Sequence, residues 1–335
     1  MKPNISVFGA GSWGTALALL AARNGCQTLI WGHDSKHLQA LAKTRQNQRY
    51  LPGFSFPETL HVSDNLQQAA SFSDLFLITV PSHAFRGTLV KLKPYVTQNT
   101  RIVWATKGFN PEDGALLSHV INQILSPDIA TATLSGPSFA LEVASNLPTA
   151  ITIASHDVVF AEQLAILFHN SRFRAYTSSD IIGVQVGGAV KNVMAIAAGI
   201  ADGLGFGANT RAALITRGLN EIMRLGLKLG GKQETLMGLA GLGDLILTCT
   251  DNQSRNRRYG IALGQGKDPA VTVREIGQEI EGIFAAKETF LLARKLGIEM
   301  PITEQTYKVL YENTRPLDAV QNLLNRDQKP EVLIL

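Results

Sequence analysis

Cysteine is almost absent from the 335-residue chain, which contains only Cys26 and Cys249. Two cysteines cannot form a disulfide framework, and these two lie far apart rather than in the closely spaced pairs typical of metal sites. The sequence therefore predicts a protein of the reducing cytoplasm, and we expect no metal site.

Charge is also sparse, since charged residues make up 17% of the chain and the formal net charge is only +4. Basic residues are scattered apart from one cluster, SRNRRYG at residues 254–260, and aromatic residues do not alternate with them. A nucleic-acid-binding protein usually has a basic track, often with aromatic side chains on which bases stack. We therefore expect no nucleic-acid partner, and the small positive surplus favours a small anionic ligand.

Long hydrophobic runs are missing as well. The apolar run at residues 16–22 is far shorter than the roughly 20 residues that cross a bilayer, and glycines before it interrupt what a signal peptide would keep apolar. No other segment is expected to reach membrane length. These absences predict a soluble protein without membrane insertion.

The composition that remains is typical of a two-domain α/β enzyme. Hydrophobic residues make up 45% of the chain, and 335 residues exceed what a single core usually supports. The polar cluster at residues 178–180 is a helix N-cap signal, and the pattern after it is almost wholly helical. We place the domain boundary there, with an α/β domain at residues 1–180 and a helical domain at residues 181–335.

The N-terminal segment has the pattern of a dinucleotide site. The apolar run Ile5–Phe8 predicts a strand, and residues 15–23 predict a helix that stops at Asn24 and Gly25. Between them lie three glycines with GxGxxG spacing: Gly9, Gly11 and Gly14. Such glycines allow a sharp turn, a close approach of backbone to pyrophosphate and tight helix–strand packing, with the phosphates at the helix N-terminus. A glycine-rich turn without a ligand is the weaker alternative, because this motif follows a strand and opens a helix.

The next predicted strand, residues 27–34, ends at the position that reads the cofactor ribose. An acidic residue there favours NAD, whereas a basic residue accommodates the 2′-phosphate of NADP. The sequence offers Gly32, His33 and Asp34 in succession. His33 could contact a 2′-phosphate when protonated or could be a solvated loop residue, so both cofactors stay open.

Further apolar runs predict the remaining strands of a doubly wound, mainly parallel sheet. They occupy residues 73–82, 101–109, 132–144, 149–155 and 173–179, the third of them broken at Gly136 and Pro137 before a helix. Ligands bind at the carboxyl ends of the strands in such folds. Three strand ends are therefore candidate ligand contacts: residues 81–82, 107–108 and 136–138.

Lys107 and Ser138 are the candidates at these ends. Lys107 could meet a substrate phosphate or a carbonyl oxygen, although taken alone it is more simply an exposed loop lysine. Ser138 could cap the following helix, and the backbone N–H groups beside it could bind an anion.

Lys191 lies in an unusually apolar segment, VGGAVKNVMAIAAGIADGLGFG at residues 186–207, with no acidic residue before Asp202. Such a lysine either reaches solvent along its own stem or is held where a reaction needs a proton. Burial lowers the pKa of a lysine, which suits it to proton transfer near neutral pH. Asn192 beside it could orient a ligand.

A second segment, residues 238–256, supplies suitable partners. Asp244 interrupts its apolar Gly/Leu run, and Ser254, Arg255 and Asn256 follow as donors for a phosphate, with the planar fork of arginine among them. Taken singly, Asp244 could be a helix cap and Arg255 a surface charge. Together with a dinucleotide site, they predict a dehydrogenase for a small phosphorylated alcohol.

Over essentially its whole length the chain resembles the bacterial NAD(P)-dependent glycerol-3-phosphate dehydrogenases. The motifs that carry the resemblance are, in order, FGAGSWGTALA, VPSHAFR, ATKGF, LSGPSFA, GGAVKNVMAIAAGIADGLGFGANTRAALITRGLNEI, GLAGLGDLILTCTDNQSRNRRYG and EGI. The resemblance implies a Rossmann domain followed by an all-α domain of the 6-phosphogluconate dehydrogenase type. It also implies reversible reduction of dihydroxyacetone phosphate to sn-glycerol 3-phosphate by NADPH or NADH, for glycerophospholipid synthesis.

The resemblance further implies roles for individual residues. Lys191 matches the catalytic proton donor and acceptor, and we expect Asp244 to position it. The implied cofactor contacts are Gly9, Gly11, Ser12, Trp13, Gly14, His33, Lys107, Ala140, Arg255 and Glu281. The implied substrate contacts are Lys107, Gly136, Ser138, Lys191, Asp244, Ser254, Arg255 and Asn256. Many relatives carry Arg near position 33, where this chain has His33; the resemblance still favours NADP, and it favours a homodimer.

Two alternatives share the same sequence features. Related 3-hydroxyacid dehydrogenases and ketopantoate reductases act on carboxylates instead of a phosphorylated ketone. A regulator that senses NAD(P)H would bind the cofactor without turnover. The lysine, the aspartate and the SRN loop argue against a sensor, because a sensor does not need groups for proton transfer.

Overall fold

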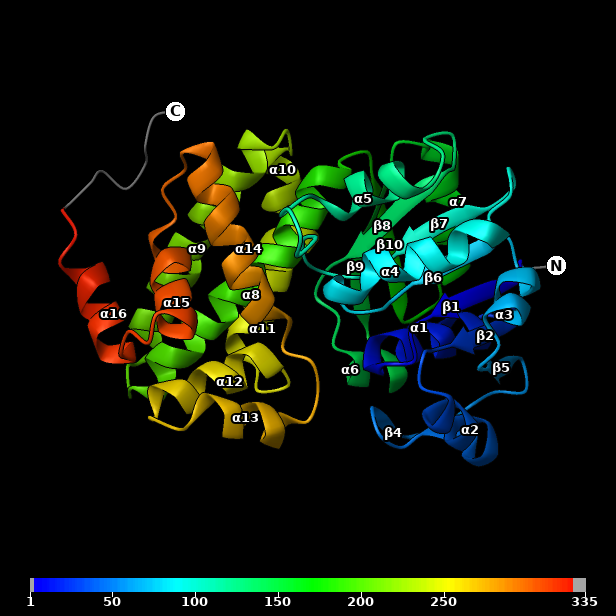
Figure 1. Cartoon of the computed structure of the whole chain (residues 1–335), viewed down its shortest axis with the longest axis horizontal. Helices are drawn as coiled ribbons and strands as arrows, with labels where there is room; N and C mark the ends of the chain where they lie inside the picture. Colours follow the sequence, from blue (N-terminus) through cyan, green and yellow to red (C-terminus); the bar gives the residue numbers. More distant parts are fainter. Residues whose placement is uncertain (1–2, 328–335) are drawn as a thin grey trace.

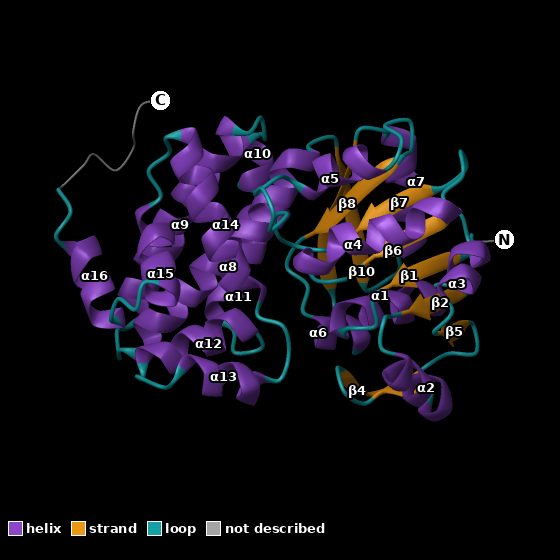
Figure 2. Ribbon diagram, in the orientation of Figure 1, coloured by secondary structure: helices purple, strands orange, loops and turns teal. Residues whose placement is uncertain are grey.

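The computed structural model describes residues 3–327, which form two parts lying side by side (Figure 1). Figure 2 shows that the N-terminal part is a sheet with helices on both of its faces and that the C-terminal part consists of helices. This is the predicted fold class, a Rossmann-type α/β domain followed by an all-α domain.

Eight strands form one sheet in the order β10-β9-β8-β7-β6-β1-β2-β5. They are β1 (Ile5–Phe8), β2 (Thr28–Trp31), β5 (Leu60–Ser63), β6 (Leu75–Ile78), β7 (Arg101–Trp104), β8 (Thr131–Ser135), β9 (Thr149–Ser155) and β10 (Phe173–Ser178). Neighbouring strands are parallel except β8 and β9, which are antiparallel. The sequence predicted all of them but β5, whose LHVS has only two apolar residues, and it also missed the small hairpin of β3 (Gln46–Asn47) and β4 (Leu51–Ser55).

Successive strand residues pack on opposite faces of the sheet. Val7 and Leu77 belong to the core on one face, whereas Phe8 and Phe76 belong to the core on the other. The first core is covered by α1 (Ser12–Arg23), α2 (Ser35–Thr44), α6 (Ala140–Ala144) and α7 (Val158–Phe168), and the second by α3 (Leu66–Phe72), α4 (Ser82–Leu92) and α5 (Leu117–Ile124). Burial on both faces explains why the strands are continuous apolar runs.

The helical part is built around α8 (Ile181–Gly203), which Asp180 caps by accepting a hydrogen bond from the Gly183 amide at 2.8 Å. Asp180 also accepts from the Lys232 amide at 2.8 Å, so this cap fixes a second segment. The other helices are α9 (Ala208–Lys228), α10 (Gln233–Leu236), α11 (Asp244–Thr250), α12 (Arg255–Gly264), α13 (Pro269–Ile276), α14 (Glu281–Leu296), α15 (Pro301–Tyr311) and α16 (Pro316–Leu324).

The expectation that no segment reaches membrane length was wrong for α8. By length and composition, it is the one helix among residues 3–327 that could cross a membrane. However, 89% of its most apolar window is buried inside the protein, as in the core helix of a helical domain. Its apolar character serves internal packing, and no membrane insertion is implied.

Helices α8 and α12 approach each other at glycines. A Cβ added at Gly199 of α8 would lie 2.2 Å from the carbonyl oxygen of Arg257, and one added at Gly260 of α12 would lie 2.2 Å from that of Ile196. Both distances are far inside van der Waals contact. The two backbones can therefore lie this close only where neither residue has a side chain.

We predict that Gly199→Ala lowers the free energy of unfolding by about 1–3 kcal/mol, because the methyl group forces the two helices apart. Chemical denaturation monitored by circular dichroism measures this difference. The matched control is Gly87→Ala in α4, where an added Cβ meets nothing within 4 Å. The control should be neutral or slightly stabilising, and equal stability of both variants would contradict the packing argument.

Candidate active site

Two lysines meet one buried carboxylate between the two parts of the molecule. Lys191, in the middle of α8, donates from Nζ to Asp244 Oδ1 at 2.5 Å. Lys107, in the loop after β7, donates from Nζ to Asp244 Oδ2 at 2.6 Å. Each carboxylate oxygen therefore has its own ammonium partner, and the cluster draws on both parts of the fold.

This Lys107–Asp244–Lys191 cluster is enclosed but not sealed. The side chain of Asp244 is 1% exposed, whereas those of Lys191 and Lys107 are 8% and 17% exposed. With both lysines protonated, two positive charges face one negative charge, so the cluster carries a net positive charge that a phosphate or a developing alkoxide can neutralise.

Burial determines the protonation behaviour of the cluster. It lowers the pKa of Lys191 to about 8, because attraction to Asp244 only partly offsets desolvation, while repulsion from Lys107 lowers it further. Burial by itself would raise the pKa of Asp244, but Lys107 and Lys191 together outweigh it and hold that pKa below its usual value. Asp244 is therefore a carboxylate, and Lys191 can gain or lose a proton near neutral pH.

Thr248 is a member of the site that the sequence reasoning missed. Its Oγ1 accepts a hydrogen bond from Lys191 Nζ at 2.8 Å and donates to the Asp244 carbonyl at 2.6 Å. The available signal was its position four residues after Asp244, which places both on one face of α11. A π-helical turn, η2 (Leu239–Gly243), leads into α11, and such turns often accompany functional sites.

The turn after β8 joins the cluster through a backbone carbonyl. Gly136 adopts φ +145°, and its carbonyl accepts from Lys107 Nζ at 3.3 Å and from Ser138 Oγ at 2.9 Å. Ser138 is not a helix N-cap, contrary to one of the two readings, because α6 begins only at Ala140 and has Phe139 at its N-cap. Its hydroxyl instead stabilises the tight turn at Gly136.

Asn256 links three helices beside Lys191. Its Nδ2 donates to Asn192 Oδ1 on α8 at 2.9 Å, and its Oδ1 accepts from the Gly282 amide on α14 at 2.9 Å. Ser254 caps α12 by accepting from the Arg257 amide at 3.2 Å. Both residues thus have structural partners, and Asn256 contacts the residue next to Lys191.

Arg255 extends towards the dinucleotide loop. It is the first residue of α12, and its Nη1 donates to Gln278 Oε1 at 3.4 Å, an atom that also accepts from Ser12 Oγ at 3.4 Å. Burial lowers the pKa of Arg255, which remains a cation at any physiological pH. Gln278, absent from the predicted set, therefore bridges the helical part and the N-terminus of α1.

The glycine turn has the shape that a dinucleotide needs. Gly9 adopts φ +130°, and a Cβ at Gly14 would lie 2.1 Å from the Gly9 carbonyl oxygen, whereas a Cβ at Gly11 would meet nothing within 4 Å. Helix α1 begins at Ser12, three residues earlier than predicted, and no side chain caps it. Free backbone N–H groups beside open space at a helix N-terminus suit a pyrophosphate, so the residues present fit a dinucleotide.

Other predicted cofactor contacts surround this turn. Trp13 packs against the core, and its Nε1 is buried without a hydrogen-bond partner among the described residues. Ala140 is the first residue of α6 and packs on the same core as α1. His33 is exposed at the end of β2.

Asp34 has a structural role next to His33. Its carboxylate caps α2 by accepting from the His37 amide at 3.1 Å, and it pairs with Arg49 at 3.6 Å. The hydrogen bond from His37 is the main cause that lowers the pKa of Asp34. The carboxylate of Asp34 therefore already has two partners, the His37 amide and Arg49.

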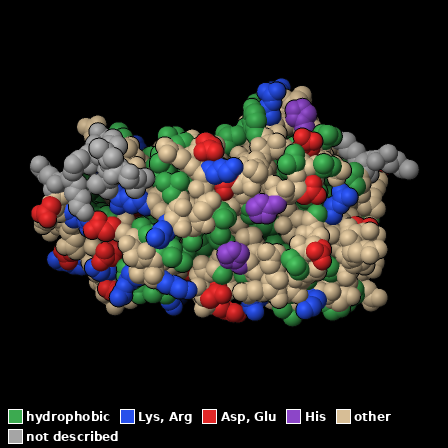
Figure 3. Space-filling view, turned by 90° about the horizontal axis from the view of Figure 1, so that it is seen from above, with side chains coloured by type: hydrophobic (Ala, Val, Ile, Leu, Met, Phe, Trp, Pro, Cys, Tyr) green, Lys and Arg blue, Asp and Glu red, His purple; other side chains and the backbone are tan. Residues whose placement is uncertain are grey.

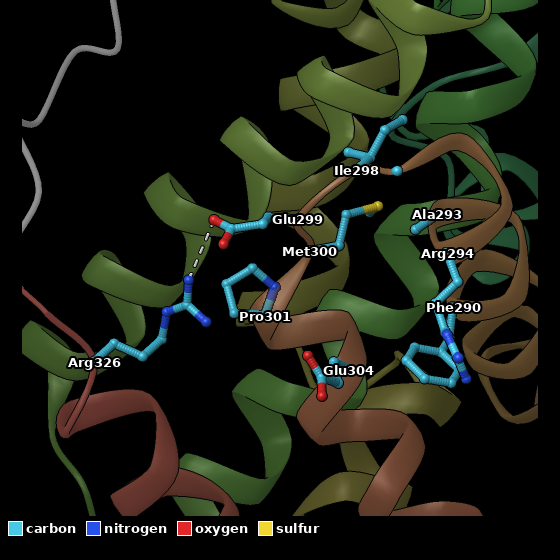
Figure 4. A pocket seen from close by; sticks show the side chains of 10 residues that line it. Phe290, Ala293, Arg294, Ile298, Glu299, Met300, Pro301, Glu304 and Arg326 are labelled. Carbon is cyan, nitrogen blue, oxygen red and sulfur yellow. Dashed lines mark hydrogen bonds and ion pairs between the residues drawn. The ribbon is translucent and has the colours of Figure 1, made fainter.

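Two cavities of the helical part lie apart from these residues. The pocket in Figure 4, about 230 Å³, is lined by Phe290, Met300 and others of the helical part, with Arg326 paired to Glu299 at 3.4 Å. A larger apolar groove of about 850 Å³ lies among α9, α15 and α16. Figure 3 shows lysine and arginine interspersed with acidic side chains on the face it presents, not gathered into a track.

Comparison with known proteins identifies the family. Residues 4–161 match the family described as NAD-dependent glycerol-3-phosphate dehydrogenase N-terminus, and residues 180–321 match the corresponding C-terminus. The chain belongs to the NAD-dependent glycerol-3-phosphate dehydrogenase family.

Similar proteins agree with this assignment. The glycerol-3-phosphate dehydrogenase [NAD(P)+] of Methylococcus capsulatus is 57% identical over 99% of both chains, and that of Pseudoalteromonas translucida is 56% identical over 98% of both. The crystal structure of glycerol-3-phosphate dehydrogenase from Coxiella burnetii superposes with a TM-score of 0.95 at 49% identity, covering 97% of this chain and 99% of that one. A ketopantoate reductase from Ralstonia eutropha, 16% identical with a TM-score of 0.61, shares the fold. The chain is thus an NAD(P)-dependent oxidoreductase by family.

We predict that Asp244→Asn lowers the free energy of unfolding by about 3–5 kcal/mol, because it leaves two largely buried ammonium groups without their counter-charge. Urea denaturation at pH 7 measures the loss. Asp128→Asn, at an exposed carboxylate that accepts a hydrogen bond from Ser126 Oγ at 3.1 Å, is the control and should change stability by less than about 0.5 kcal/mol. Equal effects of the two variants would show that the buried charge is not needed for stability.

Proposed function

We propose that the protein interconverts dihydroxyacetone phosphate and sn-glycerol 3-phosphate with NADPH or NADH. The observation that carries the proposal is the Lys107–Asp244–Lys191 cluster at the carboxyl edge of a dinucleotide-binding sheet. The names of the relatives support the same reaction. Because sn-glycerol 3-phosphate is the backbone of glycerophospholipids, we infer a role in their synthesis.

The dinucleotide would be held by both parts of the molecule. Its pyrophosphate fits the N-terminus of α1, and Arg255 approaches that end from α12 through Gln278. The proposed cofactor contacts are Gly9, Gly11, Ser12, Trp13, Gly14, His33, Lys107, Ala140, Arg255 and Glu281. When bound, the nicotinamide supplies or accepts the hydride exchanged at the substrate carbon.

Lys191 moves the proton that accompanies the hydride. Asp244 and Thr248 accept two of its three ammonium hydrogens, so the third can be directed at the substrate carbonyl oxygen. As that oxygen becomes an alkoxide, Lys191 donates its proton, and Asp244 stabilises the ammonium form that must be regenerated. In the oxidative direction, neutral Lys191 accepts the alcohol proton.

The remaining polar groups orient the phosphorylated substrate. Lys107 adds positive charge where cofactor and substrate meet, and Arg255 supplies a bidentate fork for a phosphate. The other proposed substrate contacts are Gly136, Ser138, Ser254 and Asn256. These groups suit a phosphate, and the names of the relatives favour it over the carboxylate that a hydroxyacid dehydrogenase would bind.

We infer that NADPH is the preferred cofactor. The carboxylate of Asp34 is already used by the His37 amide and by Arg49, so it is poorly placed to accept from a ribose hydroxyl. His33 beside it is exposed and can meet a 2′-phosphate.

We also infer a cytoplasmic homodimer that needs no nucleic acid. These assignments rest on family resemblance, on sparse cysteine and on the scattered basic residues. Light scattering coupled to size-exclusion chromatography measures the oligomeric state.

We predict that Lys191→Ala lowers turnover of dihydroxyacetone phosphate by about 10²–10⁴-fold, the contribution of a general acid. The dissociation constant for NADPH should stay nearly unchanged. Oxidation of NADPH and NADH followed at 340 nm measures turnover, and cofactor fluorescence measures binding. Lys228→Ala, at an exposed lysine in the last turn of α9, is the control.

The same assay separates the alternatives. Turnover with 2-keto or 3-keto acids in place of dihydroxyacetone phosphate would indicate a hydroxyacid dehydrogenase. Cofactor binding without turnover of any small ketone would indicate a sensor. Near-normal turnover by Lys191→Ala would remove that residue from the mechanism.

The pH profile should differ between the two directions. Ketone reduction requires the ammonium form of Lys191, so kcat/KM for dihydroxyacetone phosphate should fall about tenfold per pH unit above a pKa of about 8. Alcohol oxidation requires the amine, so its kcat/KM should rise with pH up to that value. Because reduction consumes one proton, the two profiles must diverge whichever group carries it, so the test of Lys191 is the pH at which each profile bends. Bends far from pH 8 in both directions would exclude Lys191 as the proton carrier.

A further inference from the structure

The segment between α13 and α14 crosses from the helical part to the sheet. We call residues 277–281, which include this connection and the first residue of α14, the strap. Gln278 accepts from Ser12 Oγ at 3.4 Å, Glu279 pairs with His83 Nδ1 at 3.7 Å, and Glu281 accepts from Ser82 Oγ at 3.0 Å. The strap therefore touches the sheet domain at the start of α1 and at the start of α4, the two helices that follow β1 and β6.

Ser82 is fixed more firmly than the other serine in these contacts. It is 1% exposed, and it is the first residue of α4. Gly108, with φ +152°, lies directly against it, since a Cβ at Gly108 would be 2.7 Å from Ser82 Cβ and 2.9 Å from its Oγ. The same Cβ would lie 3.8 Å from Glu281 Oε2. Ser82, Gly108 and Glu281 are thus packed together immediately beside Lys107.

The Glu281 carboxyl is unusual because it is buried at this junction. Burial raises its pKa to about 7, and repulsion from Glu279 on the strap adds to the rise. The hydrogen bond from Ser82 is the largest opposing effect, and Arg255 from α12 adds attraction. Glu288, two turns along α14, also interacts electrostatically with Glu281, and His83 on α4 faces Glu279.

Ionisation decides what this carboxyl can bind. A carboxylate only accepts hydrogen bonds, whereas a protonated carboxyl also donates one. The hydroxyl and amide N–H groups of a dinucleotide are donors, so they bind the carboxylate more strongly than the neutral carboxyl, which accepts only as an uncharged group. Hydrogen bonds to a charged acceptor are about twice as strong as neutral ones.

We propose that Ser82 is a positioning residue for the dinucleotide, which aims the Glu281 carboxylate at the cofactor and keeps it ionised. This inference rests on the proposed function, in which Glu281 contacts the cofactor. Ser82 acts from the sheet domain on a residue of the helical domain, so it also couples the relative position of the two domains to cofactor binding.

The test is the dissociation constant of the full-length protein for NADPH and for NADH, measured by cofactor fluorescence from pH 5.5 to pH 9. In the wild type we expect affinity to increase as pH rises through about 7, where Glu281 ionises. Ser82→Ala should weaken binding by about tenfold at pH 7, the scale of a lost charge-assisted hydrogen bond. It should also move the midpoint of the pH dependence upwards, because the carboxylate has lost its donor.

Two further variants make the result specific. Ser155→Ala removes another buried serine hydroxyl, which donates at 2.7 Å to the carbonyl of Thr131, the first residue of β8. This variant should change neither the affinity for the cofactor nor the midpoint of its pH dependence. Glu281→Gln should abolish the dependence of cofactor affinity on pH near 7. Adding Ser82→Ala to Glu281→Gln should weaken cofactor binding much less than Ser82→Ala does in the wild type. If Ser82→Ala proves unstable in a thermal melt, the pH dependence of cofactor affinity in Glu281→Gln still tests the inference.

The outcomes separate this inference from the proposed function. If the wild type reduces dihydroxyacetone phosphate but Ser82→Ala binds cofactor with wild-type affinity and midpoint, the inference is overturned and the function stands. If Glu281→Gln keeps the wild-type pH dependence, the inference also falls. If the wild type binds cofactor with the expected dependence on Ser82 but reduces no dihydroxyacetone phosphate, the proposed function fails alone.

Discussion

The site depends on the attraction between the carboxylate of Asp244 and the two lysines that it pairs with, Lys107 and Lys191. Without it, Lys191 and Lys107 would be two cations held close together in a largely dry space, and the fold would favour their separation or deprotonation. With it, both lysines stay at one point with a single excess positive charge. The attraction also limits how far burial lowers the pKa of Lys191, which stays at about 8, so the lysine can still hold a proton near neutral pH.

The cluster joins two domains that the chain builds separately. Lys107 comes from the end of a central strand, and Asp244 and Lys191 come from helices of the C-terminal part. The Gly136 carbonyl and the strap contacts lie at the same junction. These polar contacts therefore hold the two domains together, and the cluster is complete only when the domains are docked.

The sequence predicted the parts of the site that follow a regular pattern. The GxGxxG turn was recognisable because its strand, glycines and helix are consecutive, and Lys191 because a charge in an apolar helix needs a reason. Thr248 and Gln278 were missed because their roles depend on which helices pack together, a property that no local pattern records. Lys107 was interpretable only through resemblance, since a lysine after a strand is usually solvated.

The errors have the same physical origin. Serine is a common N-cap residue, but the hydroxyl of Ser138 donates to the Gly136 carbonyl instead, and the helix begins only at Ala140. Strand β5 has too few apolar residues to be recognised and is formed by pairing with β2. Helix α8 has the hydropathy of a membrane span because it is surrounded by protein on almost every side.

The close crossing of α8 and α12 sets the spacing between the polar side chains that these two helices carry. One helix carries Lys191 and Asn192, the other carries Arg255 and Asn256, and the two crossing glycines fix the separation of the axes. In the proposed function this site holds a carbonyl at one end and a phosphate at the other, and a displacement of about 1 Å can cost about a hundredfold in rate. The missing side chains of two glycines thus set how far the helix that carries Lys191 lies from the helix that carries Arg255.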